Sequence, residues 1–340
     1  MNYDFAGALP LPVAVMPIHH SRSLHVEGKL RARNSRLRST EGVNTSQAGR
    51  SPLKFSILTP SYGYGRFMSD CVSSVLMQEG VDLEQVVMDG ASKDETVEVL
   101  KSFSGDPRLR WVSEPDDGQS DALNKAFLMS TGDWVGWLNA DEFYLPGTLA
   151  TVVECIRKNP TVDLIYGDFL EVEFDGSLRR LVAQHDFSER VLQSTCYIPS
   201  CTTFIRRSAM PAQPWDTQCH TKMDWDLFLE LYGAGRKFKN VRQPLTAFRR
   251  HPDQVSVGSA AESPEEFSLI RDRHGIPNGA SARRTINVAG KTTRIARKIT
   301  EGGYLRQVKA SRLKGRSVRW FDEVDVQVLR ALGATFPLAV

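Results

Sequence analysis

An apolar segment that ends abruptly in acidic residues is the part of this sequence best suited to bind a charged ligand. The segment runs from Trp134 to Leu138, and Asp141 and Glu142 follow shortly after it. A buried parallel strand that ends in this way presents polar residues at the carboxyl edge of a sheet, where open α/β sheets bind their ligands. Asp141 and Glu142 therefore arrive where a ligand would lie, and they offer the oxygen donors that a hard divalent cation prefers; a cation held there could neutralise a diphosphate. A strand followed by an acidic turn is the simpler alternative.

Three other predicted strands also end in polar loops, and parallel strands would bring all four loops to one edge. The four loops are residues 59–62, 89–94, 114–118 and 139–142. A single Asp-Gly turn such as that at Asp89 has little meaning, but four polar loops at matching positions are harder to explain as turns alone. No GxGxxG or GxxxxGK[ST] pattern follows any strand, which argues against dinucleotide and P-loop phosphate sites.

Strand-like and helix-like segments alternate through the middle of the chain. The predicted strands are residues 55–59, 83–88, 109–112, 134–138 and 164–166. The predicted helices start near Phe67, at Thr96 as N-cap, at Ser120 and at Pro146. This alternation predicts right-handed βαβ units and an α/β fold with a mostly parallel central sheet flanked by helices.

Composition divides the 340 residues into three parts. Residues 1–52 lack sustained periodicity and are rich in Ser, Arg, Asn and Gly, which predicts a disordered basic segment. Residues 53–258 contain the alternating elements. Residues 259–340 are expected to form a basic, helical extension.

The sequence contains no segment with the roughly 18–20 consecutive apolar residues that a membrane span requires. The apolar run from Ala6 to Ile18 is broken by prolines and is not preceded by basic residues, so it is a poor signal peptide. The five cysteines form no CxxC pair, which favours reduced thiols over a disulfide framework or a zinc site. These features predict a cytoplasmic protein.

Basic residues dominate between Arg283 and Arg319, where Glu301 is the single acid. A solvated helical face is the simplest explanation. A peripheral contact with anionic lipid on the cytoplasmic face of the membrane is the alternative. No nucleic acid is expected as a partner, because no aromatic residues are interleaved with the charges.

Taken in order, these motifs resemble those of family 2 glycosyltransferases with the GT-A fold. The resemblance extends from about Lys54 to Gly258, and the basic extension of the chain, residues 259–340, lies beyond that range. The matching motifs are the opening strand and turn at 59–62, the acidic segment 88–96, the stretch 113–125 typical of polysaccharide-assembling members, and 138–142, where the family has its Asp-x-Asp motif.

The resemblance implies a donor site for a nucleotide-sugar. Its expected contacts are Pro60 and Tyr62 beside the nucleobase, Asp89 at the uracil or ribose, Asp117 and Asn124 at the nucleotide or sugar, and Arg249 at the diphosphate. Asp141 would coordinate Mg²⁺ or Mn²⁺, with His251 as a further metal ligand. Asn139 replaces the first acid of the Asp-x-Asp motif, and this shifts metal binding towards Asp141.

The resemblance also implies a catalytic base for the acceptor. Asp224 falls on the base position of the family's helix start, although Met223 replaces the preceding Glu. A carboxylate at a helix N-terminus is stabilised as the anion, so helix capping is the alternative role for Asp224.

The function expected from these residues is that of an inverting glycosyltransferase in polysaccharide biosynthesis of the cell envelope. The donor would be a nucleotide-sugar, most simply a UDP-sugar, and the acceptor a hydroxyl of a glycan or lipid-linked sugar. A nucleotidyltransferase would need a Gly-rich, basic first loop, which residues 62–66 resemble only faintly. Because Asn139 and Met223 depart from the family pattern, a non-catalytic sugar-nucleotide-binding or scaffold protein is the second alternative.

Overall fold

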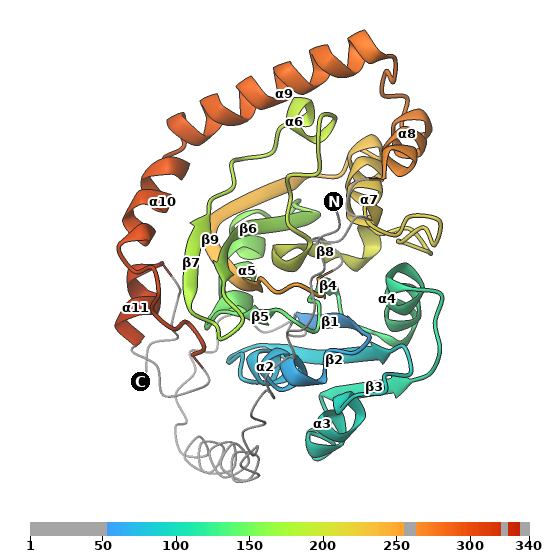
Figure 1. The fold of residues 1–340 in the computed structure, drawn as a ribbon, viewed down its shortest axis with the longest axis vertical. Coiled ribbons are helices and arrows are strands. Elements are labelled where there is room, and N and C mark those ends of the chain that lie inside the picture. Colours follow the sequence, from blue (N-terminus) through green and yellow to red (C-terminus); the bar gives the residue numbers. More distant parts are fainter. Residues whose placement is uncertain (1–52, 255–262, 321–325, 334–340) are drawn as a thin grey trace, which may run out of the picture. The chain divides into compact units, whose positions relative to one another are not determined.

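The computed structural model describes residues 53–254, 263–320 and 326–333. The predicted disordered segment 1–52 and the predicted boundary at 258/259 lie outside these residues. The described chain is built around a nine-stranded sheet of order β3-β2-β1-β4-β8-β6-β9-β5, with β7 paired to β6 (Figure 1).

The first half of the sheet has the predicted parallel βαβ order. Its strands are β1 (Lys54–Ser61), β2 (Asp82–Asp89), β3 (Leu109–Ser113) and β4 (Trp134–Trp137), and its helices are α2 (Gly65–Leu76), α3 (Thr96–Ser102) and α4 (Gln119–Met129). All three strand pairings among them are parallel.

Side chains that alternate along these strands enter two separate cores. Leu58 and Val135 pack on the face covered by α4 and by α7 (Met223–Gly233). Ile57 and Trp134 pack on the opposite face, against α2 and α5 (Thr148–Lys158). Because both faces of these strands are buried, their sequences are nearly continuous apolar runs.

The prediction of a mostly parallel sheet fails beyond β4. There, β8 (Phe204–Arg206) pairs antiparallel with both β4 and β6 (Leu164–Val172), and β7 (Leu178–Val182) forms a hairpin with β6. The long strand β9 (Phe238–Arg249) pairs parallel with β6 and antiparallel with β5 (Phe143–Tyr144). These strands come together over long sequence separations, so their direction depends on tertiary packing rather than on local periodicity.

Three predicted element boundaries also need correction. β1 continues through Pro60, which the sheet tolerates because β4 pairs with β1 only as far as Leu58. Thr96 is the first helical residue of α3 rather than its cap; the Asp94 carboxylate accepts the Thr96 N–H at 3.1 Å. Helix α5 begins two residues after Pro146, because Gly147 has a left-handed backbone (φ 72°) that no α-helix can continue through.

The described part of the basic extension is helical. It contains α8 (Pro264–Arg273), α9 (Ala280–Thr300), α10 (Gly303–Ser311) and α11 (Val326–Ala331), and α9 and α10 run along the outer side of α6 (Glu189–Leu192) and β7 (Figure 1). Arg306 joins the extension to the sheet through a 2.9 Å ion pair with fully buried Asp168. None of the described helices is both long and apolar enough to cross a membrane.

Candidate active site

A single large cavity of about 970 Å³ opens at the carboxyl ends of β1, β2 and β4. One wall consists of residues from the strand ends: Pro60, Tyr62, Gly90, Asp116, Asn139 and Asp141. The lining also includes Cys196, Tyr197, Lys222, Met223 and Asp224, with Arg294 from α9. A cavity of this volume accommodates a ligand of nucleotide-sugar size together with part of a second substrate.

Asp141 lines this cavity, and His251, from a distant part of the chain, contacts the Asp141 carboxylate although it is not itself one of the lining residues. The Oδ2 atom of Asp141 lies 3.0 Å from Nε2 of His251 and 3.2 Å from Nε2 of Gln254. Asp141 and His251 are only 6% and 5% exposed. Nδ1 of His251 has no hydrogen-bond partner among the described residues. A carboxylate oxygen and an imidazole nitrogen this close can be bridged by one cation, with Mn²⁺ tolerating the nitrogen better than Mg²⁺.

Asn139 lies in the wall, but its side-chain oxygen is already engaged. It accepts hydrogen bonds from Nε2 of Gln119 at 2.7 Å and from the indole N–H of Trp137 at 2.8 Å. The backbone N–H of Asn139 donates to the carboxyl of Glu142. Asn139 therefore orders the loop that carries Asp141, and its oxygen is not free to bind a metal.

Glu142 is buried and lies outside the cavity lining. Burial raises its pKa well above the ordinary value for a glutamate, and the neighbouring Asp141 carboxylate raises it further. Of the two adjacent acids, Asp141 is the one that lines the cavity.

Asp224 lies in the first turn of α7 and lines the same cavity. Its Oδ1 accepts the N–H of Trp225 at 2.7 Å. Burial raises the pKa of Asp224, and the Trp225 N–H, the Cys196 thiol and Lys222 only partly oppose this effect. The pKa of Cys196 is itself raised well above its usual value by burial and by Asp224, so Cys196 stays a neutral thiol. A half-buried carboxylate with a raised pKa has the property required of a general base.

The donor-side residues Pro60 and Tyr62 lie where they were expected. Both line the cavity, and the ring of Tyr62 is 70% exposed, which leaves its face available for stacking. Asp89, in contrast, is buried behind the wall, where its carboxylate accepts a 2.6 Å hydrogen bond from Ser113 and a 3.1 Å bond from the Ser92 N–H. Asp89 thus joins the ends of β2 and β3 rather than facing the cavity.

The structure places Asp116, rather than the predicted Asp117, in the lining of the cavity. Asp117 is exposed and outside the cavity lining, whereas Asp116 lines the cavity and burial raises its pKa. A Cβ atom on Gly90 would lie 2.9 Å from Oδ2 of Asp116, so glycine at position 90 is what allows the Asp116 carboxylate to approach.

Two further predicted donor contacts, Asn124 and Arg249, are engaged in structural interactions instead. The Asn124 amide donates to the backbone oxygen of Trp215 at 2.6 Å and accepts from its N–H at 3.2 Å. Arg249 is 1% exposed and forms a 2.6 Å ion pair with Asp70 of α2. β9 ends at Arg249, so the strand alternation that would place residues 249 and 251 on one face does not continue.

Two residues of the site were not anticipated from the sequence. Gln254 contacts Asp141 from a loop without a recognisable motif. Arg294 lies in the extension, beyond the range of the family resemblance. Arg294 lies four residues after Gly290 and four before Lys298, and both of these are buried. Because residues four apart share one face of a helix, this spacing places Arg294 on the face of α9 that packs against the protein.

A second cluster of potential metal ligands, Asp216, Cys219 and Asp226, lies outside the cavity lining. Arg273 pairs with both of these acids, and His274 pairs with Asp226 at 2.7 Å. Internal ion pairs therefore already satisfy this cluster.

A mixed sheet with a cavity at the ends of its first strands defines the class of GT-A nucleotide-diphospho-sugar transferases. The crystal structure of S. aureus TarS 1–349 has the same fold, with a TM-score of 0.54 at 15% identity over 74% of each chain. Residues 56–211 match the model described as glycosyl transferase family 2. This match, over somewhat less than half of the chain, agrees with the resemblance that the motifs show.

Two curated relatives agree with this classification. The chain is 29% identical over 220 residues to a hyaluronan synthase of Pasteurella multocida, a match that covers 63% of this chain and 22% of that protein. It is 34% identical over 119 residues to a PGL/p-HBAD biosynthesis glycosyltransferase of Mycobacterium bovis, which covers 34% of this chain and 46% of the relative. The chain thus matches less than half the length of either relative.

Proposed function

We propose that this protein transfers a sugar from a nucleotide-diphosphate donor to a hydroxyl of a glycan or lipid-linked acceptor in polysaccharide biosynthesis. The observation that carries the proposal is that Asp141, in contact with His251, and Asp224 line one and the same cavity. Of the relatives, one is named a hyaluronan synthase, and TarS has been solved with UDP and with UDP-GlcNAc. Both names support a UDP-sugar as the donor.

On the donor side, Pro60 and Tyr62 border the nucleobase, and Asp116 takes the sugar or ribose role first expected of Asp117. Asp141 and His251 hold a divalent ion, Mn²⁺ or Mg²⁺. When bound, this ion supplies Lewis-acid neutralisation of the charge on the leaving diphosphate. Gln254 orients Asp141 through its 3.2 Å hydrogen bond. Asp89 and Asn124 act as positioning residues, since each holds loops of the cavity rather than contacting it.

On the acceptor side, Asp224 removes the proton from the attacking hydroxyl. The proton moves to a carboxylate oxygen of Asp224 as the hydroxyl oxygen bonds to the anomeric carbon and the bond to the diphosphate breaks. One displacement with one base inverts the anomeric centre. The Trp225 N–H fixes the carboxylate, and the raised pKa makes it a stronger proton acceptor.

Calorimetric titration of the full chain with UDP, with and without Mn²⁺, tests this proposal. We expect Mn²⁺-dependent binding in the wild type and in the control Glu154→Gln, which changes an exposed acid of α5. The variant Asp141→Ala should lose at least about tenfold in UDP affinity. Equal affinity in Asp141→Ala would remove Asp141 from the donor site. Binding of a UDP-sugar without hydrolysis or transfer would favour the non-catalytic alternative.

We also propose that the outer face of α9 and α10 contacts an anionic membrane surface. Its apolar residues are unusually exposed for a surface helix: Val288, Ile295, Ile299, Tyr304, Leu305 and Val308 are between 41% and 64% exposed. Exposed Arg284 and Lys291 flank this stripe on α9. An apolar stripe bordered by basic residues fits the interface of an anionic bilayer and would serve a lipid-linked acceptor.

A further inference from the structure

Arg294 brings a positive charge into the cavity from outside the family 2 domain. It lies in α9, more than eighty residues beyond the last residue of the family match, and it is half-buried in the cavity wall. Among the residues that the structure describes, none forms a hydrogen bond or ion pair with its guanidinium. Asp224, a charged group of the same cavity, does have a hydrogen-bond partner, because its carboxylate accepts the Trp225 N–H.

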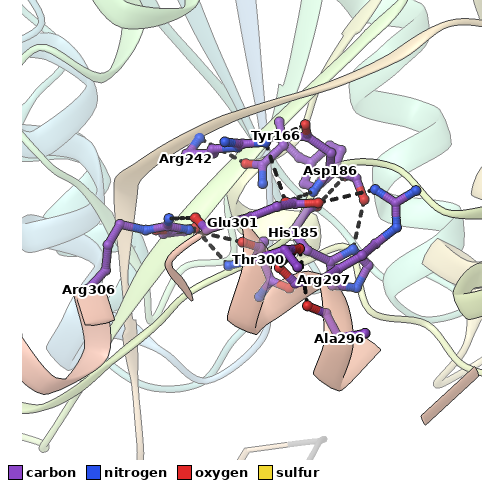
Figure 2. A network of polar contacts seen from close by, with 12 residues as sticks. Tyr166, His185, Asp186, Arg242, Ala296, Arg297, Thr300, Glu301 and Arg306 are labelled. Carbon is purple, nitrogen blue, oxygen red and sulfur yellow. Dashed lines mark hydrogen bonds and ion pairs between the residues drawn. The ribbon is translucent and has the colours of Figure 1, made fainter. Parts of the chain in front are cut away.

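The position of Arg294 is fixed by the packing of α9. A Cβ atom on Gly290, one helical turn earlier, would lie 2.4 Å from the Cβ of Ser194, so the helix approaches the segment after α6 closely at this face. At its C-terminal end, Glu301 accepts the N–H of Asp186 at 2.7 Å and pairs with Arg297 at 3.1 Å (Figure 2). Arg306 adds a 3.0 Å bond to the backbone oxygen of Glu301.

The surroundings of Arg294 provide no compensating negative charge. The groups that act on it are two neutral phenols, Tyr304 and Tyr197, and burial lowers the pKa of the guanidinium. On the same helix face, burial and Arg294 together lower the pKa of Lys298 to about 8. A half-buried cation without a partner is costly, and an anionic ligand would remove that cost.

Arg294 lies on the acceptor side of the cavity. Its neighbour Tyr197 is adjacent in sequence to Cys196, and the proposed base Asp224 lies close enough to Cys196 to raise the pKa of that thiol. Asp141 and the nucleobase-facing residues Pro60 and Tyr62 lie instead at the ends of β4 and β1. The anion that Arg294 binds is therefore part of the acceptor, not the diphosphate of the donor.

We infer that the acceptor is an acidic sugar, whose carboxylate or phosphate is held by the forked N–H groups of Arg294. A guanidinium binds planar carboxylates and phosphates through paired hydrogen bonds, which gives both affinity and orientation. Such a contact fixes the acceptor ring while its hydroxyl faces Asp224. This inference rests on the proposed glycosyl transfer and specifies its second substrate.

Competing probes of known charge test this inference on the full chain loaded with UDP and Mn²⁺. The probes are D-glucuronate, D-glucose 6-phosphate and neutral D-glucose, and their dissociation constants are measured by ligand-observed NMR. We expect one or both acidic sugars to bind at least about tenfold more tightly than glucose. Preference for glucuronate or for the phosphate then identifies which anion the acceptor carries. Equal binding of all three probes would overturn the inference without requiring any variant.

Two matched variants assign the preference to Arg294. Arg294→Gln should lose the tenfold preference, whereas Arg284→Gln, the same change at an exposed position of α9, should retain it. The affinity for UDP with Mn²⁺ is measured in parallel and should be unchanged in both. A drop in UDP affinity confined to Arg294→Gln would assign the guanidinium to the donor and overturn the inference. Loss of UDP binding in the wild type would instead contradict the proposed function itself.

Discussion

Oδ2 of Asp141 lies 3.0 Å from Nε2 of His251, although the two residues are 110 positions apart in the sequence. Asp141 follows β4 and His251 follows β9, so two strands that are not neighbours in the sheet bring these side chains together. The rings of Tyr64 and Phe67 pack against the imidazole, with distances between ring centroids of 5.5 and 4.9 Å. Nε2 of the imidazole is directed at the carboxylate of Asp141.

If this pair holds a divalent ion, removing the imidazole should weaken Mn²⁺ binding. His251→Ala is expected to lower the affinity for Mn²⁺ in the presence of UDP by about 10–100-fold. Electron paramagnetic resonance of free Mn²⁺ measures this loss directly. His274→Ala is the control, since His274 pairs with Asp226 outside the cavity. The same Mn²⁺ affinity in both variants would exclude His251 as a ligand.

Asp224→Asn should abolish proton removal without disturbing the donor. We expect the rate of transfer or donor hydrolysis to fall by about 10²–10⁴-fold while UDP affinity stays unchanged. The stability of the Asp224→Asn variant should increase, although its rate of transfer falls. A buried acid with a raised pKa binds a proton more readily in the folded state, so its contribution to stability decreases as pH rises above the unfolded pKa. Asp224→Asn should therefore raise the melting temperature at pH 7, and a lower one would contradict this assignment.

The pH dependence of the reaction rate should reveal the protonation of Asp224. Because Asp224 must be deprotonated to act as the base, kcat should fall as pH decreases through its pKa. That decrease should occur at a higher pH than for an ordinary aspartate, since burial raises the pKa of Asp224. A kcat that is constant down to pH 4 would argue against Asp224 as the base.

Arg249 is expected to matter for stability rather than for donor binding. Removing one partner of a buried ion pair costs about 3–5 kcal/mol. Because Arg319 also pairs with Asp70, at 2.7 Å, Arg249→Ala should be destabilised by less than this in urea unfolding, but by more than about 1 kcal/mol. Arg179→Ala, which removes an exposed pair with Glu173, should cost less than about 1 kcal/mol. The UDP affinity of folded Arg249→Ala should equal that of the wild type. A tenfold loss would restore the original expectation that Arg249 contacts the diphosphate.

The proposed membrane surface predicts binding that depends on both lipid charge and the apolar stripe. The full chain should sediment with vesicles rich in phosphatidylglycerol and not with pure phosphatidylcholine vesicles. Replacing Ile295 and Ile299 together by Ser should weaken this binding, because each buried side chain contributes about 1.5–3 kcal/mol. Replacing Thr285 and Thr292 by Ser on the same helix is the control. Equal sedimentation of both double variants would contradict this surface.

The sequence alone determined the first four strands, their connecting helices and the polar loops that line one edge of the sheet. Local periodicity and turn residues encode these features, because each depends on neighbours within a few positions. The same local signals placed Asp141 and Glu142 after the end of a strand, whereas Asp224 was expected only from the family resemblance. They also led to the family 2 assignment that residues 56–211 support.

Only the tertiary structure decided which polar side chains reach the cavity. Asp116 lines it and Asp117 does not, and Arg249 faces Asp70 rather than the site. Arg294 enters from a helix that follows the family domain. Each of these outcomes depends on partners far away in the sequence, and on how strands such as β9 end and helices such as α9 pack. Residue type and spacing carry no information about such long-range contacts, because burial and pairing are set by the assembled fold.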